Sequence, residues 1–159
     1  MSIHKNSDLK ILVVDDSPEL LDITLRSLRK ANYHLFSAAN GAECIEVVYR
    51  ERPDIILLDV MLPDANGKEL AVKIKKIPEF SSVFIILLSA LKTSTKDISE
   101  GLEDGADGYI ARPVNSRELL ARVAATSRII YAERESKASL FKYYSLFSSI
   151  TAVQFYRNC

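Results

Sequence analysis

The sequence predicts a doubly wound α/β sandwich, in which helices cover both faces of a parallel five-stranded sheet. Short apolar runs, typical of buried strands, alternate with stretches in which apolar residues recur at helical spacing. Right-handed crossovers between parallel strands place the intervening helices on both sides of the sheet. A chain of 159 residues is long enough for one such domain and an appendage. The strands are expected at Lys10–Asp15, His34–Ala38, Asp54–Asp59, Val83–Ser89 and Gly108–Ala111.

Capping and helix-breaking residues place the helices. Ser17 is a good N-cap and Pro18 is favoured at a first helical position, so the first helix is expected from there to Asn32. Pro53 closes the second helix, and the turn Asp64–Gly67 precedes the third. The inner face of the first helix is expected to consist of Leu20, Leu21, Ile23, Leu25 and Leu28. The later helices are expected at Gly41–Arg50, Glu69–Lys76, Thr95–Glu103 and Ser116–Arg128 or beyond.

The C-terminal tail differs in composition from the rest of the chain. All five glycines and all five prolines lie at or before Pro113, whereas seven of the thirteen aromatic residues lie in Tyr131–Cys159. We therefore expect one domain at residues 1–130 and a helical extension or truncated linker at residues 131–159. The extension is too apolar to be a solvated helix. It either packs on its own domain, is a chain end produced by truncation, or is a helix that dimerises or carries a signal.

Composition excludes several classes of function. The 21 basic and 21 acidic residues balance, which gives no electrostatic footprint for nucleic acid or an anionic membrane. Cys44 and Cys159 are far apart and His4 and His34 stand alone, so neither a disulfide framework nor a zinc site is indicated. The polar N-terminus resembles no secretory signal, and no uncharged apolar run reaches the roughly 18 residues of a membrane span. We expect a cytoplasmic protein.

Polar residues stand at the carboxyl ends of four predicted strands. Asp15 and Asp16 end the first strand, Asp59 the third and Ser89 the fourth, while Arg112 follows the fifth. With strand order 2-1-3-4-5 these ends adjoin, and ligands of open α/β sheets bind at that edge. Three neighbouring carboxylates repel one another, so either one of them is protonated or a cation binds. Mg²⁺, which prefers oxygen ligands, suits such a site.

The same residues predict phosphoryl transfer. A magnesium ion beside a carboxylate, a hydroxyl and a cation positions and neutralises a phosphoryl group. Asp59 is the best nucleophile because it stands alone at the centre of the sheet, which leaves Asp15 and Asp16 to hold the ion. Taken singly, an aspartate after a strand is usually a turn or cap residue, and Ser89 could simply end its strand. The conjunction of these residues at one edge favours a site.

Four segments, VVDDSPE, IILLDVMLPDANG, FIILLSA and GADGYIARPV, resemble in order and spacing the motifs of response-regulator receiver domains of two-component phosphorelays. The resemblance covers about residues 9–128. It implies a flavodoxin-like (βα)5 fold and an aspartate that accepts a phosphoryl group from a histidine kinase or phosphotransfer protein in the presence of Mg²⁺. It also implies a signalling switch that catalyses its own phosphotransfer and dephosphorylation, rather than a conventional enzyme.

The resemblance assigns roles to residues of this chain. Asp59 resembles the phosphoacceptor, and with Asp15 and Asp16 it resembles the acidic Mg²⁺ site. By the same resemblance, Met61 gives its backbone carbonyl to the ion. Ser89 resembles the hydroxyl that contacts the phosphoryl group.

Two further residues follow from the same comparison of motifs. Tyr109 resembles the aromatic switch of the family, although a strand aromatic can also simply pack. Ala90 is small, as the family prefers where the phosphoryl group enters. The face that changes on switching would include Lys92–Glu103 and Ser116–Arg128. Two copies could dimerise through this face and the C-terminal helix.

Arg112 departs from the family pattern, which has lysine before this proline. Guanidinium is planar, always charged and apt to pair with a carboxylate, so it either neutralises the phosphoryl group or clamps Asp59 in the resting state. The segment around Arg112 also resembles the receiver modules of hybrid sensor histidine kinases, where this arginine is familiar. The main alternative is a pseudo-receiver, which binds partners without phosphorylation.

Two other classes fit less well. A haloacid dehalogenase-type phosphatase needs two aspartates separated by one residue after its first strand, whereas Asp15 and Asp16 are adjacent. A flavodoxin needs a hydroxyl-rich phosphate loop at the same place, but the sequence DDSPEL repels phosphate unless a metal intervenes.

Overall fold

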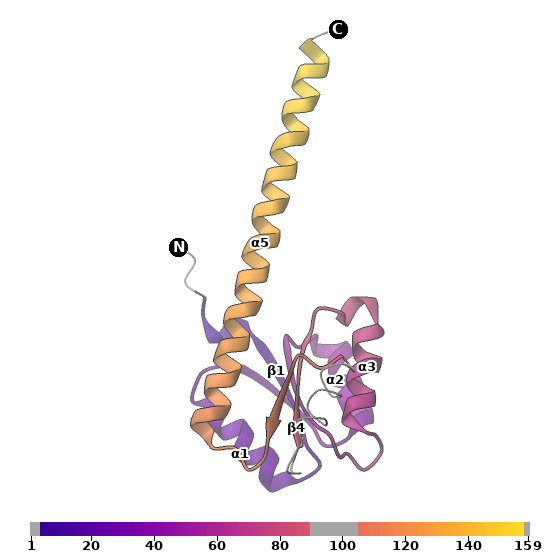
Figure 1. Ribbon diagram of the computed structural model, residues 1–159, viewed down its shortest axis with the longest axis vertical. Helices are drawn as coiled ribbons and strands as arrows, with labels where there is room; N and C mark the ends of the chain where they lie inside the picture. Colours follow the sequence, from indigo (N-terminus) through magenta and orange to yellow (C-terminus); the bar gives the residue numbers. More distant parts are fainter. Residues whose placement is uncertain (1–3, 90–104, 158–159) are drawn as a thin grey trace. The chain divides into compact units, whose positions relative to one another are not determined.

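The structure is a computed structural model that describes residues 4–89 and 105–157, with side chains described up to residue 148 (Figure 1). Its contacts divide the chain into two units, Met1–Ala124 and Ala125–Cys159. Three predictions fall outside the described residues: the helix at Thr95–Glu103, the small residue Ala90, and the part of the dimer face at Lys92–Glu103.

The first unit contains a five-stranded parallel sheet with the order β2-β1-β3-β4-β5, as the sequence predicted. Every strand lies within one residue of its predicted bounds at either end. The pairing register sets Val14 beside Leu58, Asp59 beside Leu88 and Ser89 beside Ala111, so four strands end at nearly the same level. The strands are β1 (Lys10–Val14), β2 (His34–Ala38), β3 (Ile55–Asp59), β4 (Phe84–Ser89) and β5 (Gly108–Ala111).

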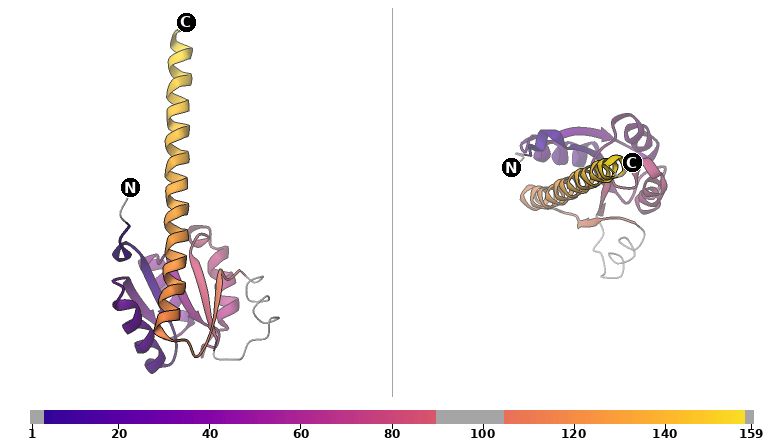
Figure 2. Two further views of the ribbon diagram at one scale, coloured as in Figure 1. Left: turned by 60° about the vertical axis from the view of Figure 1, so that its left-hand side comes forward. Right: turned by 90° about the horizontal axis from the view of Figure 1, so that it is seen from above.

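Helices lie on both faces of this sheet (Figure 1, Figure 2). Helix α1 (Pro18–Arg29) and the first turns of α5 (Ser116–Arg157) cover one face, whereas α2 (Gly41–Glu51) and α3 (Gly67–Lys76) cover the other. The 3₁₀ turns η1 (Asn6–Asp8) and η2 (Pro78–Phe80) complete the described elements. This arrangement confirms the predicted doubly wound sandwich.

Helix α1 differs from its prediction in two respects. It ends at Arg29 rather than Asn32, because Asn32 has a φ of 62° and lies in the left-handed region. Its start is as predicted, since the Ser17 hydroxyl accepts a hydrogen bond from the Leu20 amide at 3.4 Å. The predicted inner face was wrong for Leu20 and Ile23, which are exposed. The side that faces the domain instead consists of the buried residues Thr24, Ser27 and Leu28 and the half-buried residues Leu21 and Leu25.

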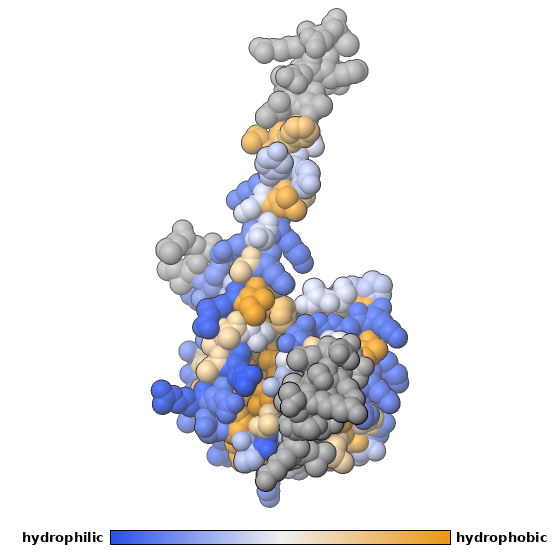
Figure 3. Space-filling model, viewed as in Figure 1, coloured by the Kyte–Doolittle hydropathy of each residue, from blue (hydrophilic) through white to orange (hydrophobic). Residues whose placement is uncertain are grey.

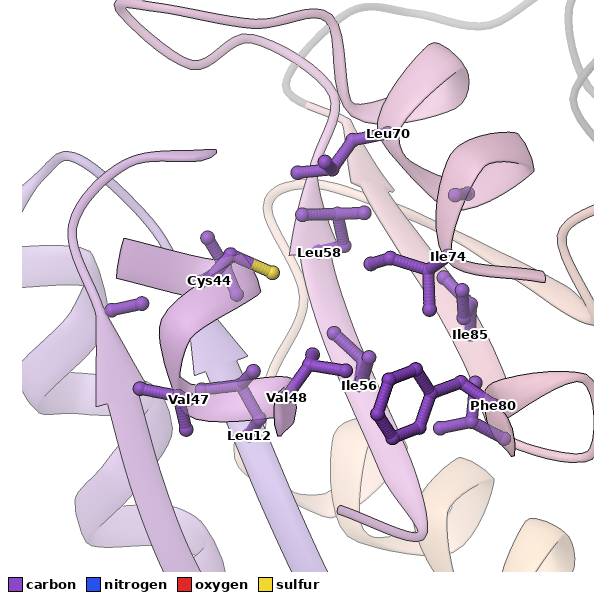
Figure 4. Close-up of a cluster of buried hydrophobic side chains, with 14 of the residues drawn as sticks. Leu12, Cys44, Val47, Val48, Ile56, Leu58, Leu70, Ile74, Phe80 and Ile85 are labelled. Atoms are coloured by element: carbon purple, nitrogen blue, oxygen red, sulfur yellow. The ribbon is translucent and has the colours of Figure 1, made fainter. Parts of the chain in front are cut away.

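The hydrophobic core beneath α2 and α3 holds the central strands in place (Figure 4). Alternate residues of β1, β3 and β4 contribute to it, because successive side chains of a strand point to opposite faces. Burying each such leucine or isoleucine stabilises the fold by about 1.5–3 kcal/mol. The buried members include Leu12, Cys44, Val48, Ile56, Leu58, Leu70, Ile74 and Ile85. The strand ends that follow these residues are therefore rigidly placed.

Helix α5 is continuous over 42 residues, from Ser116 to Arg157. Asn115 precedes it and accepts a hydrogen bond from the Glu118 amide at 2.8 Å, which satisfies one amide of the first turn. No glycine or proline follows Pro113 to interrupt the helix. Within the second unit, every side chain described from residue 133 to 148 is exposed, and apolar patches follow one another along the helix (Figure 3). Among the described residues, no helix combines the length and apolar character that a membrane crossing requires.

Candidate functional site

The carboxyl ends of β1, β3, β4 and β5 bring the predicted site residues to one edge of the sheet. Asp15 and Asp16 follow β1, Asp59 ends β3, and Ser89 ends β4. Arg112 follows β5, and its backbone amide donates a hydrogen bond to the carbonyl of Ser89 at 2.6 Å. The order of the strands thus places these five residues around one point, although they are up to 97 residues apart in the sequence.

The three aspartates form a compact acidic cluster. Each of Asp15, Asp16 and Asp59 offers a carboxylate oxygen, and these oxygens lie within 4.8 Å of one another. The Asp15 side chain is completely buried, that of Asp59 is 14% exposed, and Asp16 faces solvent. Asp15 is held by its Oδ1 atom, which accepts a hydrogen bond from the Ser17 amide at 2.9 Å. The cluster therefore runs from a fixed, buried carboxylate to an open one.

Arg112 is the cation nearest to this cluster among the described residues. Its side chain is only 9% exposed, and its Nη1 atom lies 2.6 Å from Asp15 Oδ2 and 3.9 Å from Asp59 Oδ2. The peptide bond between Arg112 and Pro113 is cis. Although the two charges are close, no described group donates a well-directed hydrogen bond to Asp15 Oδ2. The contact is thus an ion pair without hydrogen-bond alignment.

The acidic cluster fits a divalent cation. Asp15 Oδ2 is a buried carboxylate oxygen without a hydrogen-bond donor, and Arg112 supplies only one positive charge beside a cluster of three carboxylates. Three carboxylates within a few ångströms supply the hard oxygen ligands that Mg²⁺ prefers. One oxygen is buried and another is open to solvent, so an ion held here would keep water ligands.

The environment of Asp59 acts on its protonation in opposing directions. Burial raises the pKa of this carboxyl above its ordinary value, and the negative charges of Asp15 and Asp16 raise it further. The Met61 amide, which donates a hydrogen bond to Asp59 Oδ1 at 3.0 Å, lowers the pKa, as does the charge of Arg112. Burial has the largest effect. A cation at the cluster would favour the ionised, nucleophilic form of Asp59.

The loop after Asp59 is held tightly against the end of β3. The Gly67 amide donates a hydrogen bond to the Val60 carbonyl at 2.7 Å, and Met61 forms an antiparallel bridge with Asn66. A Cβ atom at Gly67 would lie 2.2 Å from the Asp59 carbonyl oxygen. Only glycine fits there without moving the backbone of Asp59. The predicted turn Asp64–Gly67 contained this glycine, but no local pattern indicated that it lies so close to Asp59.

Two predicted residues occupy the β4 and β5 side of the site. Ser89 is buried, with 4% of its surface exposed. Tyr109 is half-buried and packs against the hydrophobic core cluster. The predicted roles of these residues in switching stay predictions, as does the role of the Met61 carbonyl as a metal ligand. Sequence reasoning also missed Asp64, whose carboxylate bonds to the N-terminus of α2.

Comparison with known proteins gives consistent matches. The family model of the response regulator receiver domain matches residues 11–124. The chemotaxis response regulator CheY4 of Vibrio cholerae superposes with a TM-score of 0.70 at 29% identity, covering 74% of this chain and 98% of that one. A CheY-like receiver domain protein from Methanospirillum hungatei JF-1 gives a TM-score of 0.69 at 31% identity, covering 80% and 98%.

A third match is the receiver domain of a histidine kinase. The signal receiver domain of a signal transduction histidine kinase from Syntrophus aciditrophicus gives a TM-score of 0.68 at 30% identity. The superposition covers 74% of this chain and 89% of that chain.

Proposed function

Because the chain belongs to the response regulator receiver domain family, we propose that it accepts a phosphoryl group on Asp59, from a histidine kinase or a phosphotransfer protein, in a Mg²⁺-dependent reaction. The observation that carries this proposal is the acidic cluster of Asp15, Asp16 and Asp59 at the end of the central strands. A lone aspartate at that place would be unremarkable. The cluster contains three carboxylates, and one of their oxygens is buried without a hydrogen-bond donor. Such a cluster suits a metal-assisted phosphoryl transfer.

The chain's own residues account for the proposed transfer. A carboxylate oxygen of Asp59 forms a bond to phosphorus while the bond between phosphorus and the donor's histidine nitrogen breaks, and that nitrogen then takes up a proton. Asp15, Asp16, Asp59 and the Met61 carbonyl would hold Mg²⁺, which when bound offsets the negative charge of the phosphoryl oxygens. Ser89 and Arg112 would contact that group.

The proposed output is a shift between two conformations. Phosphorylation adds charge beside Ser89, and Tyr109 would then move inward and alter the surface that partners contact. The chain would act as a signalling switch that catalyses its own phosphorylation and dephosphorylation. Tyr109 is half-buried and already packs against the core cluster, so its ring has a neighbouring core into which it can repack.

Arg112 favours a second candidate, a pseudo-receiver that binds partners without phosphorylation. Its guanidinium already lies 2.6 Å from Asp15, where it takes up part of the charge that a metal ion would otherwise neutralise. A permanent pair of this kind would leave the fold intact and remove the need for an ion.

The C-terminal helix extends the proposal to assembly. We propose a receiver domain at residues 1–130, with residues 131–159 as a helical extension or linker, in the manner of the receiver of a hybrid histidine kinase. A homodimer through the α5 surface would cover side chains that water does not favour. Among the side chains described on α5, six large apolar ones are 54–74% exposed, namely Leu140, Phe141, Tyr143, Tyr144, Leu146 and Phe147. A cytoplasmic location also stays a prediction.

Intact-protein mass spectrometry tests the function directly. The protein is incubated with acetyl phosphate, with and without Mg²⁺, beside the variants Asp59→Asn and Arg112→Lys. A single phosphoryl adduct that needs Mg²⁺ and is missing in Asp59→Asn supports the receiver. If no adduct forms although Mg²⁺ binds, or if one forms only in Arg112→Lys, the pseudo-receiver is the better description.

A further inference from the structure

Asp64 joins two parts of the first unit that are distant in the sequence. It lies in the loop between β3 and α3, and its carboxylate accepts hydrogen bonds from the amides of Gly41, at 2.7 Å, and Ala42, at 3.0 Å. These amides open helix α2 and have no acceptor within that helix. Asn40 caps the same helix locally, by accepting a hydrogen bond from the Glu43 amide at 2.9 Å. Helix α2 therefore has one local cap and one cap from a remote loop.

The contact between the loop and α2 is close. A Cβ atom at Gly41 would lie 3.2 Å from Asp64 Oδ1 and 3.0 Å from Ala65 Cβ, so glycine lets the loop approach. The two amides lower the pKa of Asp64. The carboxylate is consequently ionised at every pH at which an ordinary aspartate is ionised. Negative charge at a helix N-terminus is also favoured by the helix dipole.

The loop itself is a compact turn that links Asp64 to Met61. The Leu62 amide donates a hydrogen bond to the Ala65 carbonyl at 3.2 Å, inside the bridge between Met61 and Asn66. Asp64 lies at the tip of this turn, and its base adjoins Asp59 through the hydrogen bond from Gly67 to Val60. A displacement of the tip would therefore shift the backbone at Met61.

Met61 and Leu62 lie toward the base of this turn rather than at its tip. The Met61 side chain is 68% exposed and cannot anchor the loop. Leu62 is half-buried and packs against the core cluster, so it secures the turn next to Met61, whereas Asp64 at the tip is exposed. The hydrogen bonds of Asp64 thus connect the tip to helix α2.

We infer that Asp64 is a positioning residue, which anchors the loop to α2 and so holds the backbone of Met61 in place for the proposed Mg²⁺ site. The inference rests on the proposed function, because it assumes that the Met61 carbonyl is a ligand. Groups that support metal ligands from outside the coordination sphere commonly change metal affinity by about 10- to 100-fold. Asp64 acts through a stretch of backbone, so we expect a smaller effect, about 3- to 10-fold.

Isothermal titration calorimetry with Mg²⁺ tests this inference. Urea unfolding in the absence of Mg²⁺ is measured on the same proteins. Asp64→Ala should raise the dissociation constant for Mg²⁺ about 3- to 10-fold, and Asp64→Asn, which keeps one acceptor oxygen, should raise it less. The matched control is Asn40→Ala, which removes the local cap of the same helix. It should lower the urea midpoint but leave Mg²⁺ affinity unchanged. The Met61 amide signal in ¹H–¹⁵N spectra should move in the Asp64 variants alone.

The outcomes separate the inference from the function beneath it. If the unaltered protein binds Mg²⁺ and Asp64→Ala binds it equally well, the inference is wrong and the metal site stands. If Asn40→Ala weakens Mg²⁺ binding as much as Asp64→Ala does, the effect comes from helix stability and the inference is again wrong. Failure of the unaltered protein to bind Mg²⁺ would overturn the proposed site and the inference together. Asp64→Asn decides the question if Asp64→Ala does not fold.

Discussion

Arg112 pairs more closely with Asp15 than with Asp59, since its Nη1 atom lies 2.6 Å from Asp15 Oδ2 and 3.9 Å from Asp59 Oδ2. The guanidinium therefore compensates the most buried carboxylate of the acidic cluster and leaves the proposed phosphoacceptor less restrained. The sequence suggested that Arg112 could clamp Asp59 in the resting state. The distances favour a different restraint, which acts on a candidate metal ligand.

Replacing Arg112 should expose the cost of the buried charge. Arg112→Gln leaves the Asp15 carboxylate without its ion pair, so we expect the free energy of unfolding without Mg²⁺ to fall by about 2–4 kcal/mol. Added Mg²⁺ should then stabilise this variant more than the unaltered protein, because the ion takes over the compensation. Urea unfolding at several Mg²⁺ concentrations measures both effects. Arg112→Lys, which keeps the charge, is the control. Equal stability of the unaltered protein and Arg112→Gln without Mg²⁺ would show that the ion pair contributes nothing.

Gly67 should tolerate no side chain. In Gly67→Ala the new Cβ atom would meet the Asp59 carbonyl oxygen at 2.2 Å and Val60 Cα at 2.8 Å, and both are backbone atoms. We expect a loss of about 3 kcal/mol in unfolding free energy together with weaker Mg²⁺ binding, because the backbone of Asp59 must shift. Gly108→Ala is the matched control, since the atom nearest to its Cβ would belong to the Ile86 side chain, at an ordinary contact distance of 3.4 Å. Similar losses in the two variants would refute the importance of this contact.

Asp59 should destabilise the fold when it is ionised. The pKa of Asp59 is raised in the folded protein, chiefly by burial. Its contribution to folding stability is therefore complete below the unfolded-state pKa of about 3.9 and is lost as the pH rises through the folded-state pKa. Asp59→Asn has no charge to desolvate and should be more stable than the unaltered protein at pH 7 without Mg²⁺. The difference should shrink as the pH falls, and Mg²⁺ should reverse its sign. Thermal unfolding of both proteins between pH 4 and 7 without Mg²⁺ measures this difference in stability. A difference that does not change with pH would contradict the prediction.

Cys44 should be inert in the folded protein. Burial, assisted by the charge of Asp64, raises the pKa of this thiol to about 12. The unfolded thiol ionises near its ordinary pKa of about 8.5, so stability due to Cys44 is complete below that pH and falls as the pH rises toward 12. The slope is at most about 1.4 kcal/mol per pH unit. Comparison of unfolding free energies for Cys44→Ala and the unaltered protein at pH 8 and 10 isolates this slope.

Thiol labelling gives an independent check on Cys44. In a Cys159→Ser background at pH 8, a thiol reagent should label Cys44 only after urea unfolds the protein, because the thiolate is the reactive form. Rapid labelling of the folded protein would contradict the burial of this side chain.

The sequence predicted the sheet well because its signals are local. The runs around Leu12, Ile56 and Ile85 are long enough and apolar enough to mark buried strands, and the polar residues after them mark where the strands end. The acidic cluster then follows from strand order alone. Asp15, Asp16 and Asp59 could be expected at one edge of the sheet without any side-chain coordinates.

Features that depend on pairs of distant residues were not predictable. The bond from Asp64 to Gly41 joins positions 23 residues apart, and nothing local to either position announces it. The preference of Arg112 for Asp15 is decided by side-chain geometry within a cluster that offers several carboxylates. The exposure of Leu20 and Ile23 was missed because all five apolar residues of α1 were assigned to one face, which is wider than one helical stripe.

The burial of the central strands has a consequence for hydrogen exchange. β1, β3 and β4 are paired on both sides and buried along almost their whole length, so their amide hydrogens should exchange with solvent only when the domain opens globally. In the described sheet, β5 pairs only with β4 and is partly exposed, so its amides can exchange through smaller openings. Ser89 thus belongs to the slowest-exchanging part of the domain, and Tyr109 belongs to a faster part. A rearrangement that involves both residues can therefore proceed by local opening of β5 while the strands that carry the carboxylates stay paired.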